Sequence, residues 1–469
     1  MSDTKSTNAP RWALASLCLS MLMPSLDTSI ANASLPTLAH ALSAPFAQVQ
    51  WVVLAYLLAI TALIVVAGRL GDLFGRRRLL VAGIVLFTLA SLACGLASSL
   101  ATLLAARALQ GLGAAAMLAL TVAMVGETVP KERTGRAMGL LGTMSAVGTT
   151  LGPSLGGVLA TAFDWRAIFL VNLPLGLVDL LLAWRCLPAS QTAPTSPRPR
   201  LDIAGTLLLA LTLAAYALAM TARQPLLLAV AAAGLLAFVQ VEARSAAPLL
   251  RLAMFRDPRL ATSLATSALV ATVIMTTLVV GPFYLARSLG LPGAVVGVVL
   301  SAGPAVAALA GAPAGRLVDR IGATRVMFCG LAAMLVGAMA LALVPVAAGV
   351  PGYLAALLVM TIGYAAFQPA NNTALMAGVD AGRRGVVAGL LSLSRNLGLI
   401  TGAAAMGAVF AAASSAADVA TAEPAAVARG LHASFGVAAG LVAVALTVAS
   451  IGRSLVRRST SGSERQLPV

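Results

Sequence analysis

An aspartate lies in the middle of a long apolar run near the N-terminus. Asp27 belongs to the stretch SLDTSIANASLP, residues 25–36, and the apolar run around it extends from about residue 12 to residue 42. An ionised carboxylate inside a bilayer costs roughly 2.5–3.5 kcal/mol even on the most permissive insertion scales. A side chain with this cost needs a partner, a proton or a function, so Asp27 is a candidate proton-binding group.

Arg107 is a second charged residue within an apolar segment. At a rise of 1.5 Å per residue it lies ~9 Å below the outer end of its predicted helix, and Asp27 lies ~12 Å below the outer end of the first helix. We therefore expect the two charges at similar depth in one bundle. The alternatives are an Asp27 that caps or hydrogen-bonds a break in its helix, and an Arg107 that binds backbone carbonyls.

The stretch GRLGDLFGRRR, residues 68–78, combines glycines with charges at the end of an apolar segment. Gly68, Gly71 and Gly75 permit a tight turn, and the arginines that begin at Arg76 anchor the inner surface. Asp72 can pair with an arginine or with the N-terminus of another helix. The alternative is that the basic run only determines topology.

Glycines also recur every four residues in the apolar segment 136–160, at Gly148, Gly152 and Gly156. They share one helix face and let another helix approach closely. Pro153 removes a backbone hydrogen bond there and predicts a bend. Tight packing alone also explains this pattern.

Amide side chains within apolar segments are candidates for substrate contact. Hydrogen bonding between helices is the commoner fate of such groups. Asp179 is a possible second intramembrane carboxylate. The amides are Asn32, Gln110, Gln368, Asn371 and Asn372.

The helices that must position these residues are membrane spans. Of 469 residues, 60% are hydrophobic and 10% are charged, with a mean hydropathy of +0.96, whereas soluble domains carry about 25% charged residues. Apolar segments of about 17–25 residues recur along the chain. We place fourteen, at 12–36, 48–69, 79–98, 101–126, 136–160, 165–185, 201–221, 225–241, 260–285, 294–314, 324–346, 351–376, 386–411 and 431–453.

The net charge of +16 reflects topology and does not indicate nucleic-acid binding. With a cytoplasmic N-terminus, most of the 31 Lys and Arg residues fall at the termini or in the even-numbered loops. The outer side receives only Arg166, Arg223, Arg287 and Arg429. No small-residue cleavage site follows the first apolar segment, so we expect a retained signal anchor.

The sequence repeats itself, because GRLVDRIGATR, residues 315–325, matches residues 68–78 in register. Two six-helix bundles and an inserted hairpin account for the offset. The expected parts are a cytoplasmic N-terminus (1–11), an N-terminal six-helix bundle (12–185), a cytoplasmic linker (186–200), an inserted transmembrane hairpin (201–241), a cytoplasmic loop (242–259), a C-terminal six-helix bundle (260–453) and a polar, disordered cytoplasmic tail (454–469).

Several chemistries find no support in the sequence. The four cysteines are scattered through apolar segments without ligand-like spacing, and the two histidines are far apart, so we expect no metal site. No nucleotide-binding P-loop or nucleophile elbow is present. We expect no enzyme activity and no cofactor, and any energy would come from a source other than ATP hydrolysed on this chain.

Five motifs in order resemble the fourteen-helix drug:proton antiporter branch of the major facilitator superfamily, over essentially the whole chain. The first is LDTSIANASLP, in which Ser29 and Ser34 depart from the branch pattern. DWRAIFLVNLP, residues 164–174, resembles the start of the sixth helix of that branch. The other three are matched by Gly68, Leu70, Asp72, Gly75, Arg76 and Arg77; by Arg107, Gln110, Gly111, Gly113 and Ala114; and by Gly148, Gly152, Pro153, Gly156 and Gly157.

The resemblance implies a major facilitator fold and assigns roles to these motifs. It implies that Arg107 takes part in proton transfer, and that the loop of Asp72 forms an inner latch. It also implies that the bendable fifth helix lines the exchange between inward-open and outward-open states. We add that Asp27 couples efflux to the proton gradient.

We therefore expect an all-α membrane protein that exports lipophilic cationic or neutral small molecules in exchange for protons, by alternating access. We expect it as a monomer in the bacterial inner membrane, with both termini cytoplasmic. One alternative is an exporter or symporter of a specific metabolite on the same fold. A receptor or scaffold that transports nothing is the other, but a scaffold gains nothing from buried charge.

Overall fold

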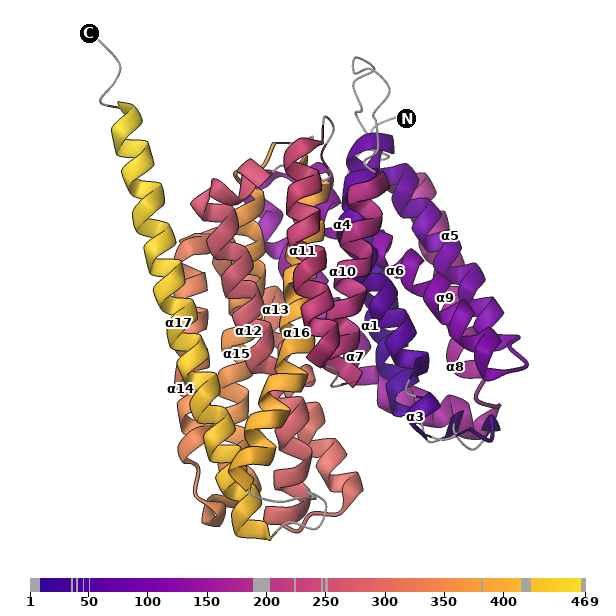
Figure 1. Cartoon of the computed structure of the whole chain (residues 1–469), viewed down its shortest axis with the longest axis vertical. Helices are drawn as coiled ribbons and strands as arrows, with labels where there is room; N and C mark the ends of the chain where they lie inside the picture. The colour runs from indigo at the N-terminus through magenta and orange to yellow at the C-terminus, as the bar shows by residue number, and fades with distance from the viewer. Residues whose placement is uncertain are drawn as a thin grey trace, which may run out of the picture. The chain divides into compact units, whose positions relative to one another are not determined.

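A computed structural model shows a helical chain (Figure 1). No strand occurs in the part of the chain that it describes, which is residues 9–34, 37–38, 41–44, 46–49, 51–188, 203–222, 225–245, 248, 252–380, 383–414 and 423–464. Most of the predicted N-terminal segment and of the predicted linker, 186–200, lies outside these residues.

Contacts divide the chain into two compact units. The first comprises Met1–Leu250, Gly311–Asp319 and Gly378–Leu393. Its helices are α1 (Ala9–Ala33), α3 (Phe46–Val49), α4 (Trp51–Phe74), α5 (Arg76–Gly95), α6 (Leu100–Thr128), the 3-10 helix η1 (Lys131–Arg133), α7 (Thr134–Ala162), α8 (Ala167–Leu170), α9 (Asn172–Cys186), α10 (Ile203–Ala222) and α11 (Pro225–Arg244).

The second unit comprises Arg251–Ala310, Arg320–Ala377 and Ser394–Val469, so α13 and α16 contribute to both units. Its elements are the 3-10 helix η2 (Leu252–Arg256), α12 (Pro258–Phe283), the π-helix η3 (Tyr284–Ser288), α13 (Gly293–Ile321), α14 (Ala323–Leu343), the 3-10 helix η4 (Val346–Ala348), α15 (Gly349–Met376), α16 (Arg384–Ser414) and α17 (Pro424–Glu464).

Twelve helices among the described residues are long and apolar enough to cross a membrane. The predicted spans at 136–160 and 201–221 are the helices α7 and α10, which are not among the twelve. Both include residues whose side chains are not described, and the apolar part of α10, Leu207–Met220, is short. The structure therefore supports a twelve-helix count, and the fourteen predicted spans are not established.

Three sequence predictions need correction. Gly68 and Gly71 lie inside α4 and form no turn; only Gly75 has a positive φ, of 97°, where α4 gives way to α5. Asp319 lies beyond the end of the predicted span 294–314, but it is in the last turn of α13, because that helix continues to Ile321. The predicted disordered tail is helical as far as Glu464, since α17 continues past residue 453.

Each unit has its own apolar core. In the first unit, α1 packs against α7 and α9, and α6 packs against α4 and α5. Leu26 and Ile30 of α1, Val52 of α4 and Phe169 of α8 are buried in this core. In the second unit, α14 packs against α15 and α17, around a core that includes Tyr353.

Candidate functional site

Four helices of the first unit bring a cluster of polar side chains into its core. Asp27 and Arg107 are 1% and 0% exposed, on α1 and α6. Tyr56 comes from α4 and Asn172 from the first turn of α9. The capping box of Ser99 and Thr102 fixes the start of α6 two turns before Arg107.

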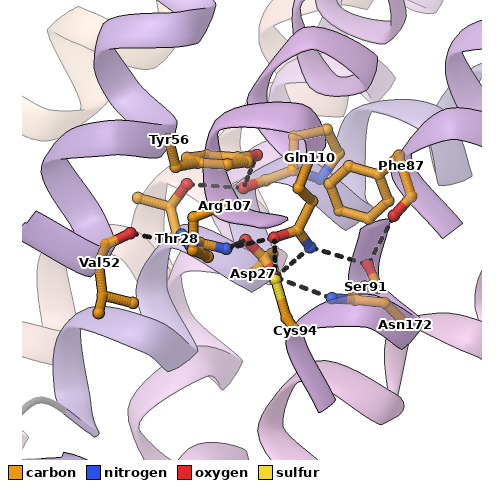
Figure 2. A network of polar contacts seen from close by, with 11 residues as sticks. Asp27, Thr28, Val52, Tyr56, Phe87, Ser91, Cys94, Arg107, Gln110 and Asn172 are labelled. Atoms are coloured by element: carbon orange, nitrogen blue, oxygen red, sulfur yellow. Dashed lines mark hydrogen bonds and ion pairs between the residues drawn. The ribbon is translucent and has the colours of Figure 1, made fainter. Parts of the chain in front are cut away.

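Asp27 accepts hydrogen bonds on both carboxylate oxygens (Figure 2). Arg107 Nη1 donates to Oδ2 at 2.5 Å. Gln110 Nε2 and Asn172 Nδ2 donate to Oδ1 at 2.9 and 2.8 Å. Three donors from α6 and α9 therefore hold one carboxylate of α1, which is the satisfaction that a buried charge requires.

Arg107 has further partners around its guanidinium. Its Nε donates to the carbonyl of Val52 at 2.9 Å, and Nη1 also donates to Gln110 Oε1 at 2.6 Å. The guanidinium carbon lies 4.3 Å from the centre of the Tyr56 ring and 5.5 Å from that of Phe169. These aromatic faces stabilise a cation that water does not reach.

Gln110 extends the cluster towards α5. Its Nε2 also donates to Ser91 Oγ at 2.8 Å, and Ser91 donates to the carbonyl of Phe87 at 2.7 Å.

The buried ion pair of Asp27 and Arg107 links the charge of one partner to the stability of the other. Removing one partner of a buried ion pair costs about 3–5 kcal/mol. A proton that binds Asp27 would leave Arg107 without its counter-ion, so protonation of Asp27 and rearrangement of this cluster are linked.

The sequence predicted Asp27 and Arg107 at similar depth, and the structure places them in direct contact. It adds Asn172, Ser91 and Tyr56, which the sequence did not assign to this cluster. Asn172 belongs to the stretch DWRAIFLVNLP, so its place next to a motif was the one signal that could have identified it. Tyr56 and Ser91 carry no such signal in a single sequence.

Asp72 caps a helix of the other sequence repeat. Its Oδ1 and Oδ2 accept from the backbone N–H groups of Gly385 and Val386 at the start of α16, each at 2.9 Å. Arg76 donates to Asp72 and to Glu127. Gly68 makes this approach possible, since an added Cβ would lie 2.1 Å from the carbonyl oxygen of Gly385.

Asp319 repeats this arrangement at the related position. Its carboxylate oxygens accept from the N–H groups of Gly135 and Arg136 at the start of α7, at 2.8 and 2.9 Å. An added Cβ at Gly139 would lie 2.3 Å from the carbonyl oxygen of Gly311. Two carboxylates related by the repeat therefore each stabilise a helix N-terminus, where the macrodipole favours negative charge.

The glycines of α7 face α1. Added Cβ atoms at Gly148 and Gly152 would lie 2.8 Å from the carbonyl oxygen of Leu22 and 2.3 Å from Ser29. Gly156 lies on the same face, near Ile30 and Ser34. The predicted close approach is confirmed, with α1 as the partner. Pro153 and Gly157 lie in α7 but are not among the residues whose side chains are described, so the predicted bend stays a prediction.

The predicted substrate-binding amides occupy different environments. Gln110 is buried in the Asp27 cluster, and Asn371 accepts a hydrogen bond from Ser263 on α12 at 2.7 Å. Gln368 and Asn372 are half-buried on α15, and Asn32 is exposed near the end of α1. Gln110 and Asn371 thus have protein partners that connect neighbouring helices.

A second buried carboxylate lies elsewhere on the interface of α1 and α9. Asp179 is 0% exposed and accepts from Ser16 Oγ at 2.7 Å and from Ser20 Oγ at 2.6 Å. No ion pair with Asp179 occurs among the described residues. Ser20 precedes Asp27, and Asn172 precedes Asp179, by about two helical turns, so the two carboxylates lie ~10 Å apart along the interface.

Membrane-length helices that bury an ion pair in a compact unit define a multi-pass membrane protein. The family model of the Major Facilitator Superfamily matches residues 17–403 and 260–468. The chain belongs to the Major Facilitator Superfamily, whose members are transporters and not enzymes.

Relatives with known names support the same assignment. The chain is 34% identical to multidrug resistance protein Stp of Mycobacterium tuberculosis (strain CDC 1551 / Oshkosh), over 84% of this chain and 74% of Stp. It is 28% identical to riboflavin transporter RibZ of Clostridioides difficile (strain 630), over 86% of this chain and 88% of RibZ. The proton:xylose symporter XylE shares the fold, with a TM-score of 0.67 at 16% identity, over 92% of this chain and 95% of XylE.

Proposed function

We propose that this chain is a proton-coupled multidrug exporter, which exchanges protons for lipophilic cationic or neutral compounds by alternating access. The observation that carries the proposal is the buried ion pair of Asp27 and Arg107 within membrane helices. A group of this cost in the membrane is by default a candidate for function. The likeness to Stp, a protein named for multidrug resistance, supports the substrate class.

In this mechanism Asp27 carries the proton. When Asp27 is protonated, the guanidinium of Arg107 loses its counter-ion and retains Val52, Gln110 and the Tyr56 ring as partners. When Asp27 releases its proton inward, the ion pair forms again as the substrate is exported. The proton gradient is the energy source, and no cofactor is required.

A transporter of one specific metabolite on the same fold is the second candidate. The relative RibZ is named as a riboflavin transporter and matches a similar share of this chain, which favours this alternative. A buried proton-binding carboxylate serves a symporter as well as an antiporter, because both use the same gradient.

Ethidium efflux from cells that express the protein tests the proposal. We expect efflux above that of empty-vector cells, and we expect a protonophore to abolish it. Efflux that persists with the protonophore would exclude proton coupling. Absence of efflux for a panel of lipophilic cations, together with uptake or export of a single metabolite such as a flavin, would favour the second candidate.

We also propose that Asp72 and Asp319 act in gating, as paired contacts of the two repeats at the cytoplasmic end. Asp72 both caps α16 and pairs with Arg76, whereas Asp319 has only the helix cap among the described residues. Asp72→Ala should therefore reduce the initial rate of efflux more than Asp319→Ala does. Equal efflux of both variants and wild type, at equal amounts in the membrane, would contradict a gating role.

The fourteen-helix arrangement is part of the proposal, with two six-helix bundles and a hairpin of α10 and α11 between them. α10 packs against α11 and α4, as an added pair of spans would. We propose a monomer in the bacterial inner membrane with both termini in the cytoplasm. Reporter fusions after residues 200, 223 and 247 test this, since cytoplasmic, external and cytoplasmic signals are expected in that order; three identical signals would contradict the hairpin.

The charge of the substrate follows from the carboxylates. A dication favours two neighbouring desolvated carboxylates that no protein cation neutralises. Of the four buried acids in the described membrane helices, Asp27 and Asp72 already pair with arginines. The other two, Asp179 and Glu242, lie on α9 and α11, which are not packing partners among the described helices. We therefore propose a preference for monovalent cations. Strong, proton-dependent efflux of a bis-cationic biocide together with weak efflux of ethidium would overturn it.

A further inference from the structure

A cavity of about 530 Å³ lies within the second unit, apart from the Asp27 cluster. Three arginines from three helices line it: Arg259 at the start of α12, Arg325 at the start of α14 and Arg453 on α17. All three are exposed to solvent. Like charges gather in one cavity at a cost, which an anion in that cavity would offset.

The start of α14 adds to the positive character of this cavity. The first residues of α14 line it, and Gly322 at the N-cap has no side chain with which to cap the N–H groups of that turn. Ser263 and Asn371, 8% and 1% exposed, form part of the wall and bond to each other. No carboxylate lines the cavity among the described residues, and Asp257 caps α12 outside it.

The region of the first repeat that corresponds to this cavity contains an ion pair that the second repeat lacks. Gly75 and Gly322 have the same position in the two repeats, about 247 residues apart, and both have a positive φ. Backbone contacts of Gly83 with Gly113 and of Gly330 with Gly363 extend the match to the next helices. On this match Arg76 corresponds to Ala323, which lines the cavity, and Glu127 corresponds to Ala377.

The first repeat therefore fills this region with the ion pair of Arg76 and Glu127, whereas the second repeat has two alanines there and retains arginines without an acid in the cavity. Guanidinium groups that converge from several helices match the oxygens of a phosphate group, because each can donate two parallel hydrogen bonds.

We infer that this cavity binds a phosphate-bearing anion, supplied either by the headgroup of an anionic phospholipid or by a soluble phosphate ester. It lies at the end of the unit that the arginine distribution predicts to face the cytoplasm, where basic pockets between membrane helices bind anionic headgroups. This inference does not rest on the proposed drug:proton exchange.

The test compares purified wild-type protein with the double variant Arg325→Gln/Arg453→Gln. The matched control is Arg320→Gln, which changes an exposed arginine in the last turn of α13 that does not line the cavity. One arm measures bound phosphatidylglycerol and cardiolipin by native mass spectrometry, against phosphatidylcholine. The other arm measures thermal stabilisation by glycerol 3-phosphate and by inorganic phosphate.

We expect wild type and Arg320→Gln to bind at least one of these anions. The affinity of the double variant for that anion should be lower by a factor of roughly ten or more, because charge-assisted hydrogen bonds are lost. Binding in the lipid arm alone assigns the headgroup, and binding in the soluble arm assigns the ester. The single variant Arg453→Gln, with an intermediate effect, guards against misfolding of the double variant. Equal binding by all variants, or no anion binding in either arm, would overturn the inference.

Discussion

The two buried aspartates of the first unit lie on the same pair of helices and are satisfied in different ways. Asp27 on α1 faces a guanidinium and two amides, whereas Asp179 on α9 faces two serine hydroxyls. Loss of the Asp27 carboxylate leaves a buried Arg107 without its counter-ion. Loss of the Asp179 carboxylate leaves only hydroxyl groups, which can find other acceptors on their own helix.

A carboxylate in an ion pair and a carboxylate bound by hydroxyls differ in their capacity to drive a conformational change. A charge pair links the state of one partner to the position of the other, since an unpaired buried ion is costly. Two hydroxyls can donate to a carboxylate and can accept from a carboxylic acid, so they accommodate either form with little movement. We therefore propose that coupling depends on Asp27 and expect Asp179 to be secondary.

The largest effect is expected from Asp27→Asn, which keeps the shape of the side chain but cannot ionise. Per molecule in the membrane, the variant should lose substrate-evoked proton release in vesicles, together with uphill efflux. Its stability should also fall, because Arg107 is left without a counter-ion. Asp179→Asn is the matched control and should retain most of both activities. An Asp27→Asn protein that still pumps uphill and exchanges protons would make Asp27 structural, and loss of coupling in Asp179→Asn alone would reverse the comparison.

The second largest effect is expected on the stability of the protein when Arg107 of the Asp27–Arg107 ion pair is replaced. Arg107→Gln leaves Asp27 buried without a cation, so unfolding in detergent should become easier by about 3–5 kcal/mol. The double variant Asp27→Asn/Arg107→Gln removes both charges and should recover a large part of that loss. A double variant whose loss equals the sum of the two single losses would show that the pair is not coupled.

The smallest effect is expected around Asp179. Ser16→Ala/Ser20→Ala removes both hydroxyl donors to Asp179. We expect the free energy of unfolding to fall by about 1–3 kcal/mol, as measured by thermal unfolding, because the buried Asp179 carboxylate is left unsatisfied. Transport per folded molecule should stay close to that of wild type. Ser450→Ala, an exposed serine that bonds to its own helix, serves as the control. A loss of transport without a loss of stability would give Asp179 a role in the proton path.

Much of the helical architecture could be predicted, because a membrane span needs a long apolar segment and the sequence displays these directly. The predicted segments coincide with observed helices to within a few residues at most ends. The ends that were wrong lie where polarity changes before the helix ends. α17 continues into a polar stretch as far as Glu464, and α13 includes Asp319.

The candidate site could be predicted only in part. Depth along a helix follows from the rise per residue, so the sequence indicated that Asp27 and Arg107 lie at a similar level. The direction in which a side chain points across a bundle depends on how the helices pack. For this reason the contact itself, and the addition of Asn172, Ser91 and Tyr56, emerged only from the structure.

The class of protein, the apolar segments, the repeated loop motif and the residues whose charge is costly in a membrane could all be identified before the structure was known. All of these depend on composition and local spacing, which the chain carries without folding. Helix packing, in contrast, was needed to show that Gly68 makes a close contact with α16 and forms no turn. It also showed that Asp72 and Asp319 each cap a helix of the other repeat, and that three arginines share one cavity. These pairings join residues that are far apart in the chain, and the packing of small side chains between helices brings them together.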